Sequence, residues 1–74
     1  MKVLLFGLLA EKAGTAVLEL DVCSLADLRC ALQERIPGFE RLSHAVAVDR
    51  VIVHEERPLL GGEEIAVLPP FAGG

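Results

Sequence analysis

The sequence predicts an α+β domain in which a mixed sheet packs against one main helix, with the element order ββαβββ. Short apolar or alternating segments, typical of strands, lie on both sides of a single segment with helical spacing. At 74 residues the chain has room for one hydrophobic core. One helix can cover only one face of such a sheet, so the other face is expected to stay open.

The first two strands are expected near the start of the chain. Residues 2–7 form a compact apolar run that ends in Gly7, and residues 15–22 alternate between apolar and polar side chains. The intervening residues 8–14 are too few for much beyond a turn of helix. We therefore expect a hairpin-like unit with a longer loop.

The main helix is expected to begin after Ser24. Ser24 can cap the helix, and the acidic Asp27 in the first turn is favoured by the helix dipole. Pro37 and Gly38 are expected to end the helix. One apolar stripe follows at helical spacing, formed by Leu25, Leu28, Leu32 and Ile36.

The second half of the chain predicts three more strands. Residues 45–49 and 51–53 read as two short strands joined by a turn at Asp49 and Arg50. The segment 54–60 contains Pro58 and is expected to be irregular. Residues 61–64 have the composition of a turn, and a last strand is expected at 65–68. The glutamates at 55–56 and 63–64 are expected to lie in solvated turns.

The two-residue period of a strand assigns each side chain to a face of the sheet. The face toward the helix is expected to hold Val3, Leu5, Ala16, Leu18, Leu20, Val46, Val48, Ile65 and Val67. The opposite face is expected to hold Leu4, Phe6, Val17, Ala47, Ala66 and Leu68. If the first and last strands are neighbours, Leu4, Phe6, Ala66 and Leu68 form one apolar patch, and such patches often mark binding surfaces. The alternative is a slipped register, or loops that cover this face.

The sequence after the last strand suggests an extended tail. We expect a domain at residues 1–68 and a tail at 69–74, whose residues are Pro69, Pro70, Phe71, Ala72, Gly73 and Gly74. The prolines favour extended backbone, the two glycines can pass through a narrow slot, and Phe71 offers an apolar anchor. The final carboxylate would then be a handle for chemical modification. The alternative is an ordinary frayed end.

Composition favours a protein partner over other partners. Apolar residues make up 53% of the chain, and the mean hydropathy of +0.51 suggests that some apolar surface faces a partner. The net charge of −4 argues against nucleic acid. No apolar run reaches the roughly 20 residues of a membrane span, and no signal-type segment is present, so we expect a cytoplasmic protein.

The cysteines and histidines do not suggest a metal site. Cys23 and Cys30 have the spacing of neither a redox pair nor a zinc site, so free thiols are expected. His44 and His54 have no acidic or cysteine ligands at suitable spacing. We expect no metal bound by this chain.

Several segments together resemble a known family. They are the opening Met-Lys-Val-Leu-Leu-Phe, the helix from Ser24-Leu-Ala-Asp to Arg35-Ile-Pro-Gly, Ala45-Val-Ala-Val-Asp, Pro58-Leu-Leu-Gly-Gly-Glu-Glu-Ile, and Leu68-Pro-Pro-Phe-Ala-Gly-Gly. The sequence is similar to the small subunit of molybdopterin synthase, one of the ubiquitin-like β-grasp sulfur carriers, which are related to the thiamine-pathway carrier. Asp49, often Asn in the family, and the bulky Phe71 are departures from its pattern.

The resemblance implies a reaction at Gly74. A ubiquitin-activating-type adenylyltransferase would use ATP and Mg²⁺ to adenylate the terminal carboxylate, and a sulfur donor protein would convert it to a thiocarboxylate. The tail would then enter the large subunit of molybdopterin synthase and give sulfur to a pterin precursor of the molybdenum cofactor. Catalytic acid–base groups would come from the partner, and this chain would bind no cofactor. Partner-binding residues would be Leu4, Phe6, Ala66, Leu68, Pro69, Pro70, Phe71, Ala72 and Gly73.

Other readings of the same tail stay open. The carrier could serve thiamine synthesis or tRNA thiolation, or the chain could be a ubiquitin-like modifier joined to lysines through Gly74. A plain interaction module with an inert end is a further alternative.

Overall fold

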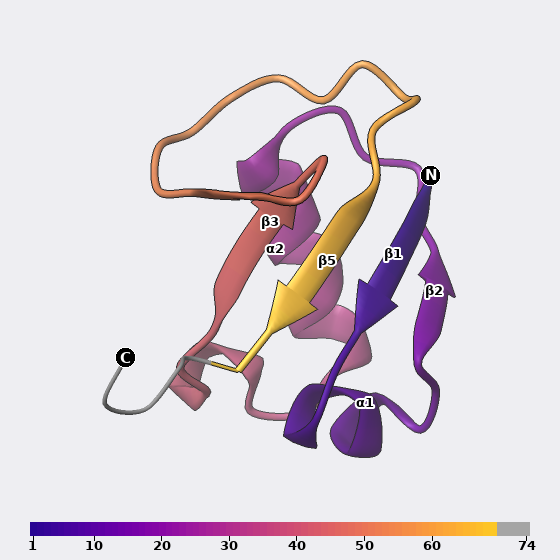
Figure 1. Cartoon of the computed structure of the whole chain (residues 1–74). Coiled ribbons are helices and arrows are strands. Elements are labelled where there is room, and N and C mark those ends of the chain that lie inside the picture. Colours follow the sequence, from indigo (N-terminus) through magenta and orange to yellow (C-terminus); the bar gives the residue numbers. More distant parts are fainter. Residues whose placement is uncertain (70–74) are drawn as a thin grey trace.

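The computed structural model of the chain describes residues 1–69, which form one five-stranded mixed sheet with a helix against one face (Figure 1). The strand order in the sheet is β2-β1-β5-β3-β4. The strands are β1 (Lys2–Leu5), β2 (Val17–Glu19), β3 (Ala45–Val48), β4 (Val51–Val53) and β5 (Ile65–Leu68). The helices are α1 (Leu8–Ala13), the main helix α2 (Leu25–Arg35) and the short 3₁₀ helix η1 (Phe39–Arg41).

The first and last strands lie side by side at the centre of the sheet. β1 and β5 pair in parallel, with Leu4 opposite Ala66, while the other neighbouring strands pair antiparallel. This arrangement confirms the predicted α+β class and the element order of the strands and main helix. It also confirms that the two strands of the predicted apolar patch are neighbours. Both strands point toward the same edge, so β5 leads out of the sheet next to the start of α1.

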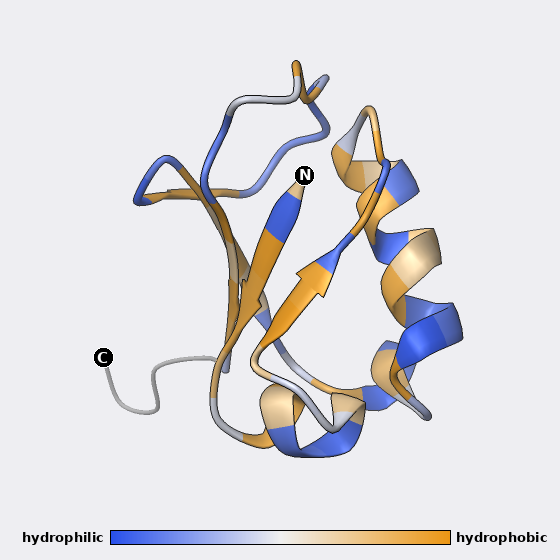
Figure 2. Cartoon of the chain, turned by 90° about the vertical axis from the view of Figure 1, so that its right-hand side faces the viewer, coloured by the Kyte–Doolittle hydropathy of each residue, from blue (hydrophilic) through white to orange (hydrophobic). Residues whose placement is uncertain are grey.

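The core lies between the sheet and α2 (Figure 2). Apart from Ala16, the strand residues that were expected to face the helix do so, and Val3, Ile65 and Val67 are fully buried. The stripe on α2 is also fully buried, and it consists of Leu25, Leu28 and Leu32, with Ile36 just beyond the helix end. Burying one such side chain contributes about 1.5–3 kcal/mol, so this layer supplies most of the stability of a small domain.

The start of α2 is capped on several backbone groups. The hydroxyl of Ser24 accepts a hydrogen bond from the backbone N–H of Asp27 at 3.1 Å, as predicted. The Asp27 carboxylate in turn accepts from the N–H of Cys23 at 3.1 Å. The carboxylate of Glu56 accepts from the N–H of Ala26 at 3.1 and 3.2 Å, which ties the segment after β4 to the helix. Orphan donors of the first turn are thereby satisfied.

The segment between the first two strands differs from the prediction. Residues 8–13 form a six-residue helix where a loop was expected. Gly14 ends the helix in the left-handed conformation, and its N–H donates to the carbonyl of Ala10 at 2.9 Å. Leu9 anchors the helix, with 2% of its surface exposed. The preceding Gly7 has no side chain to cap a helix, so the start of α1 carries no sequence signal.

Three predicted strands are shorter in the structure. β1 covers Lys2–Leu5 instead of residues 2–7. β2 covers Val17–Glu19 instead of residues 15–22, because its only partner is the short β1, and Ala16 is exposed instead of facing the helix. β3 ends at Val48, because Asp49 and Arg50 have φ of 51° and 69° and form the predicted turn. The side chain of Asp49 accepts a hydrogen bond from the N–H of Glu64 at 2.9 Å. An asparagine oxygen could accept the same bond, so this departure from the family pattern keeps the local fold.

No helix among residues 1–69 has the length and hydropathy needed to cross a membrane. The predicted division into a domain at 1–68 and a tail at 69–74 stays a prediction, because residues 70–74 lie outside the described part of the chain.

Candidate functional site

The sheet face opposite α2, here called the open face, carries an apolar row across every strand. The row follows directly from the strand register and consists of Val17, Leu4, Ala66, Ala47 and Ile52, one residue from each strand. Ala47 in this row is buried, and Leu4 and Ala66 are half-buried. Val17 is 44% exposed and Ile52 is 36% exposed. No helix of the described residues covers this face (Figure 1).

A second apolar group lies at the end of the open face from which β5 leaves the sheet. Leu68 pairs with Ala45, and the N–H of Phe6 donates to the carbonyl of Val67 at 3.2 Å, which places Phe6 beside the end of β5. Phe6 is 44% exposed, and Leu68 is half-buried. The structure thus brings together the four predicted patch residues Leu4, Phe6, Ala66 and Leu68.

The other end of the open face is charged. Lys2 pairs with Glu19 across β1 and β2, and Arg50 lies 3.6 Å from a carboxylate oxygen of Glu64 just before β5. The two ends of the open face therefore differ. The end next to the tail is apolar, and the opposite end is charged. A partner with an apolar surface beside a pocket would meet the tail and the patch together.

The predicted tail residues are only partly within the described chain. Pro69 is exposed and follows β5 directly. Pro70, Phe71, Ala72, Gly73 and the predicted reactive Gly74 lie outside the described residues. Their assignment as site residues stays a prediction.

Sequence reasoning missed Ala45 and Ile52 as members of the open face. Ile52 belongs to a three-residue run of β-branched residues without polar alternation, so the run alone does not say which side chain faces which way. The two-residue turn at Asp49 and Arg50 would have fixed the register, because it sets Ala47 opposite Ile52.

Two polar residues outside the open face, His44 and Cys23, contact neighbouring groups of the fold. Nδ1 of His44 lies 3.0 Å from the carbonyl of Leu42, and the His44 ring lies 4.5 Å from that of Phe39. Cys23 and Cys30 are free and exposed, as predicted. The hydrogen bond between the Cys23 thiol and the Asp27 carboxylate raises the pKa of Cys23, and the negative charge of that carboxylate raises it further. No group of three or more His, Cys, Asp or Glu within residues 1–69 could hold a metal ion.

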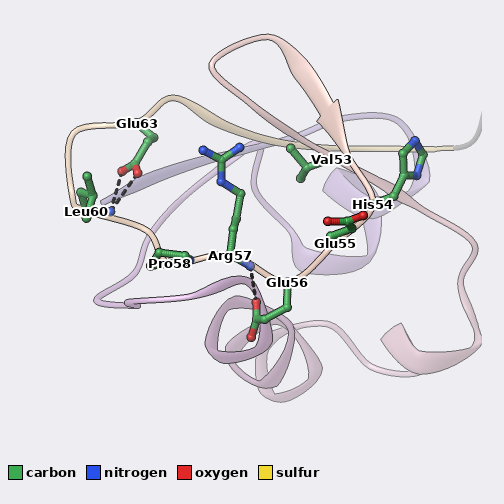
Figure 3. Close-up of a pocket in the computed structure, with 8 residues that line it drawn as sticks. All are labelled: Val53, His54, Glu55, Glu56, Arg57, Pro58, Leu60 and Glu63. Atoms are coloured by element: carbon green, nitrogen blue, oxygen red, sulfur yellow. Dashed lines mark hydrogen bonds between the residues drawn. The ribbon is translucent and has the colours of Figure 1, made fainter.

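A groove of about 530 Å³ lies at the segment between β4 and β5 (Figure 3). Two of its carboxylates serve backbone groups, which corrects the prediction of merely solvated turns. Glu56 holds the start of α2, and Glu63 accepts from the N–H groups of Leu60 and Gly61 at 2.8–3.0 Å. These bonds lower the pKa of Glu63. The segment between β4 and β5, here called the strap, therefore has a structural role. It buries Leu59 against the core, and the groove lies along its side.

Comparison with known proteins gives one family. The model of the ThiS family matches residues 3–74. No curated protein matches the sequence significantly.

Solved structures show the same fold over nearly the whole chain. One is SAMP1 from Haloferax volcanii, at 27% identity and a TM-score of 0.79, with 99% of this chain and 97% of that one covered. A second structure of small archaeal modifier protein 1 from the same organism, at 24% identity and a TM-score of 0.80 with 95% of each chain covered, supports the fold alone. A third is from a complex of subunits 1 and 2 of the molybdopterin-converting factor from Helicobacter pylori, at 28% identity and a TM-score of 0.73. It covers 99% of this chain and 96% of that one. These proteins are β-grasp and ubiquitin-like, as the predicted fold is.

Proposed function

The chain belongs to the ThiS family of ubiquitin-like sulfur carriers, and we propose that it carries sulfur as a thiocarboxylate on Gly74 for molybdopterin synthesis. In this role it is the small subunit of a molybdopterin synthase. The large subunit receives the tail, and a pterin precursor accepts the sulfur.

The observation that carries this proposal is the apolar end of the open face next to Pro69. Phe6 and Leu68 flank the point where β5 gives way to the tail, so one partner can cover the patch and receive the tail at once. The similarity of this chain to one from a two-subunit molybdopterin-converting factor complex supports a partner of that kind.

The chemistry requires activation before transfer. A carboxylate is a poor electrophile, so an adenylyltransferase first joins Gly74 to AMP from ATP and releases pyrophosphate, with Mg²⁺ in that enzyme. A persulfide on a donor protein then attacks the acyl carbon, and AMP leaves. Reductive cleavage of the sulfur–sulfur bond by a thiol leaves the thiocarboxylate on Gly74. The anionic sulfur is the nucleophile that the large subunit directs at the pterin.

The proposal divides the work between this chain and its partners. The chain supplies a carrying group and a docking face, and it binds no cofactor of its own. Acid–base catalysis belongs to the large subunit, and activation belongs to the adenylyltransferase. All of these encounters are expected in the cytoplasm.

The test is the intact mass of the protein purified from its own host. We expect a fraction whose mass has risen by the difference between one sulfur and one oxygen atom, located on Gly74 by fragmentation. Deletion of Gly73 and Gly74 should remove this species. A fully active deletion variant, or a native polypeptide that continues beyond Gly74, would contradict the proposal.

A second candidate is a protein modifier, which the similarity to SAMP1 favours. It predicts larger species in cell extract in which Gly74 is joined to lysine side chains.

The identity of the partner that co-purifies with the chain distinguishes the possible carrier pathways. A molybdopterin synthase large subunit supports the proposal, whereas a thiamine-synthesis or tRNA-thiolation enzyme supports the other carrier roles.

A further inference from the structure

Gly7 lies against Pro69 at the point where the tail leaves the sheet. A Cβ built on Gly7 would come within 3.3 Å of Cγ and 3.7 Å of Cδ of the Pro69 ring. A contact of 3.3 Å is tighter than side chains normally make, so Pro69 would have to shift by a few tenths of an ångström. The missing side chain of Gly7 is therefore what lets the proline ring rest on the backbone.

The backbone of Gly7 is held in place from both sides. Its carbonyl accepts hydrogen bonds from the N–H groups of Ala10 and Glu11 at 3.1 and 3.2 Å, in the first turn of α1. The preceding Phe6 donates to the carbonyl of Val67 in β5 at 3.2 Å. Because Leu9 anchors α1 in the core, Gly7 cannot move away to accommodate a larger neighbour.

The conformation of Gly7 also requires glycine. Its φ is 58° and its ψ is −135°, a region that residues with a Cβ rarely adopt. Gly38 has a φ of 72°, but a Cβ on it would meet nothing within 4 Å. The two positions share positive φ, but Gly38 lies in the left-handed helical region with ψ of 18°, which costs an alanine less than the conformation of Gly7, and Gly38 has no contact with Pro69.

We propose that Gly7 is a positioning residue that sets the direction in which the tail leaves the domain. This inference rests on the proposed function. The proline ring lies against the backbone of Gly7, so this contact fixes the point at which the chain leaves the domain. A displacement of Pro69 would move that point and alter how Gly74 is presented to the partner. Misplacement of a reacting group by about 1 Å can cost up to 10²-fold in rate.

The experiment measures sulfur transfer by thiocarboxylated Gly7→Ala, Gly38→Ala and wild-type chains to the purified large subunit carrying the pterin precursor. For Gly7→Ala we expect the maximal rate at saturating carrier to fall about tenfold, with equilibrium binding through the open face unchanged. For Gly38→Ala we expect the wild-type maximal rate, although both variants lose stability from a strained φ. Assays run well below both melting temperatures.

Pro69→Ala provides a second arm in which little loss of stability is expected, because Pro69 is exposed; urea unfolding checks that this variant is folded. Removing the ring takes away the atoms that rest on Gly7, so this variant should also lose maximal rate. In the Pro69→Ala background the further effect of Gly7→Ala should shrink, which a double-mutant cycle measures. Equal rates for wild type, Gly7→Ala and Pro69→Ala would overturn the inference while leaving the carrier role intact.

A structural measurement separates failure of this inference from failure of the proposed function. In the unmodified chain, an NMR nuclear Overhauser contact between the Gly7 Hα atoms and the Pro69 ring is expected, and its absence overturns the inference without any assay of activity. A wild-type chain that shows the contact but never carries sulfur would instead overturn the proposed function and, with it, the catalytic consequence of the contact.

Discussion

The two faces of the sheet are both apolar, yet only one of them is buried. On the covered face, Val3 and Val67 are completely inaccessible to solvent beneath α2. On the open face, their chain neighbours Leu4 and Leu68 are half-buried, and Phe6 is 44% exposed. An apolar strand residue therefore has one of two roles in this molecule. It stabilises the fold on the covered face, or, under the proposed function, it offers a surface for a partner on the open face.

This difference accounts for the high apolar content of the chain. A sheet with one wet face normally alternates apolar and polar side chains. Here both sets of alternate positions in β3 and β5 are apolar, as is all of β1 except Lys2, and the additional apolar residues include those beside the start of the tail. Single substitutions on each of the two faces test the two roles directly.

The largest effect is expected from the covered face. Leu28→Ala removes a fully buried side chain from α2 and should lower the free energy of unfolding by about 2–5 kcal/mol, because a cavity remains. Urea unfolding followed by circular dichroism measures the change. The folded fraction should still bind the large subunit normally. A loss below about 1 kcal/mol would mean that α2 is not the cover on which the core depends.

The next effect concerns binding and not stability. Phe6→Asp places a charge in the patch beside the tail and should weaken binding to the large subunit by at least about 2 kcal/mol, or about 30-fold. The free energy of unfolding should change far less than in Leu28→Ala, because Phe6 is 44% exposed. Isothermal titration calorimetry and urea unfolding measure the two quantities.

Leu60→Asp is the matched control for that charge. Leu60 is 88% exposed and lies on the strap between β4 and β5, away from the patch. It should leave both binding and stability unchanged. Normal binding by Phe6→Asp, or an equal loss in both variants, would remove the open face as the docking surface.

A smaller effect is expected at the start of α2. Ser24→Ala deletes the hydroxyl that accepts from Asp27 N–H and should cost about 1 kcal/mol of stability. Binding should not change, because the proposed docking surface lies on the open face. Ser43→Ala, at an exposed serine outside any helix, is the control and should be neutral in urea unfolding. A binding defect in Ser24→Ala would contradict the assignment of stability to the covered face and of binding to the open face.

The smallest effect is expected at Cys23, near the start of α2. The Asp27 carboxylate lies 3.6 Å from the thiol sulfur and raises the pKa of Cys23, so the reactive thiolate forms only at higher pH. In a Cys30→Ser background, Asp27→Asn should lower this pKa and shift the rate of maleimide labelling to lower pH. A pH–rate profile measures the shift. Unshifted profiles would rule out the carboxylate as the cause.

The sequence predicted the parts of the fold that depend on a local pattern of side chains, such as a helix cap or a regular apolar spacing. Ser24 and the leucine stripe gave α2, and alternation with Gly and Pro punctuation gave the last three strands and the shared face of Leu4 and Ala66. The same alternation placed Ala16 toward the helix, where it is in fact exposed, because strand length depends on a pairing partner and not on local pattern.

The remaining features depend on backbone contacts between distant segments. α1 begins at a glycine without a capping side chain, and the contact of Gly7 with Pro69 joins residues from the two ends of the described chain. The bonds from Glu56 to the start of α2 likewise exist only after the chain has folded. Local sequence patterns carry no information about such pairs.

The central place of β5 has a consequence for synthesis on the ribosome. This strand follows every other element in the chain, yet it sits between β1 and β3 and completes both ladders. A nascent chain therefore cannot close its sheet until residue 68 has left the exit tunnel, and pairing of such distant strands raises the contact order. Products that terminate before β5 lack the middle strand of the sheet and therefore the row of side chains that joins Leu4 to Ala47 across the open face.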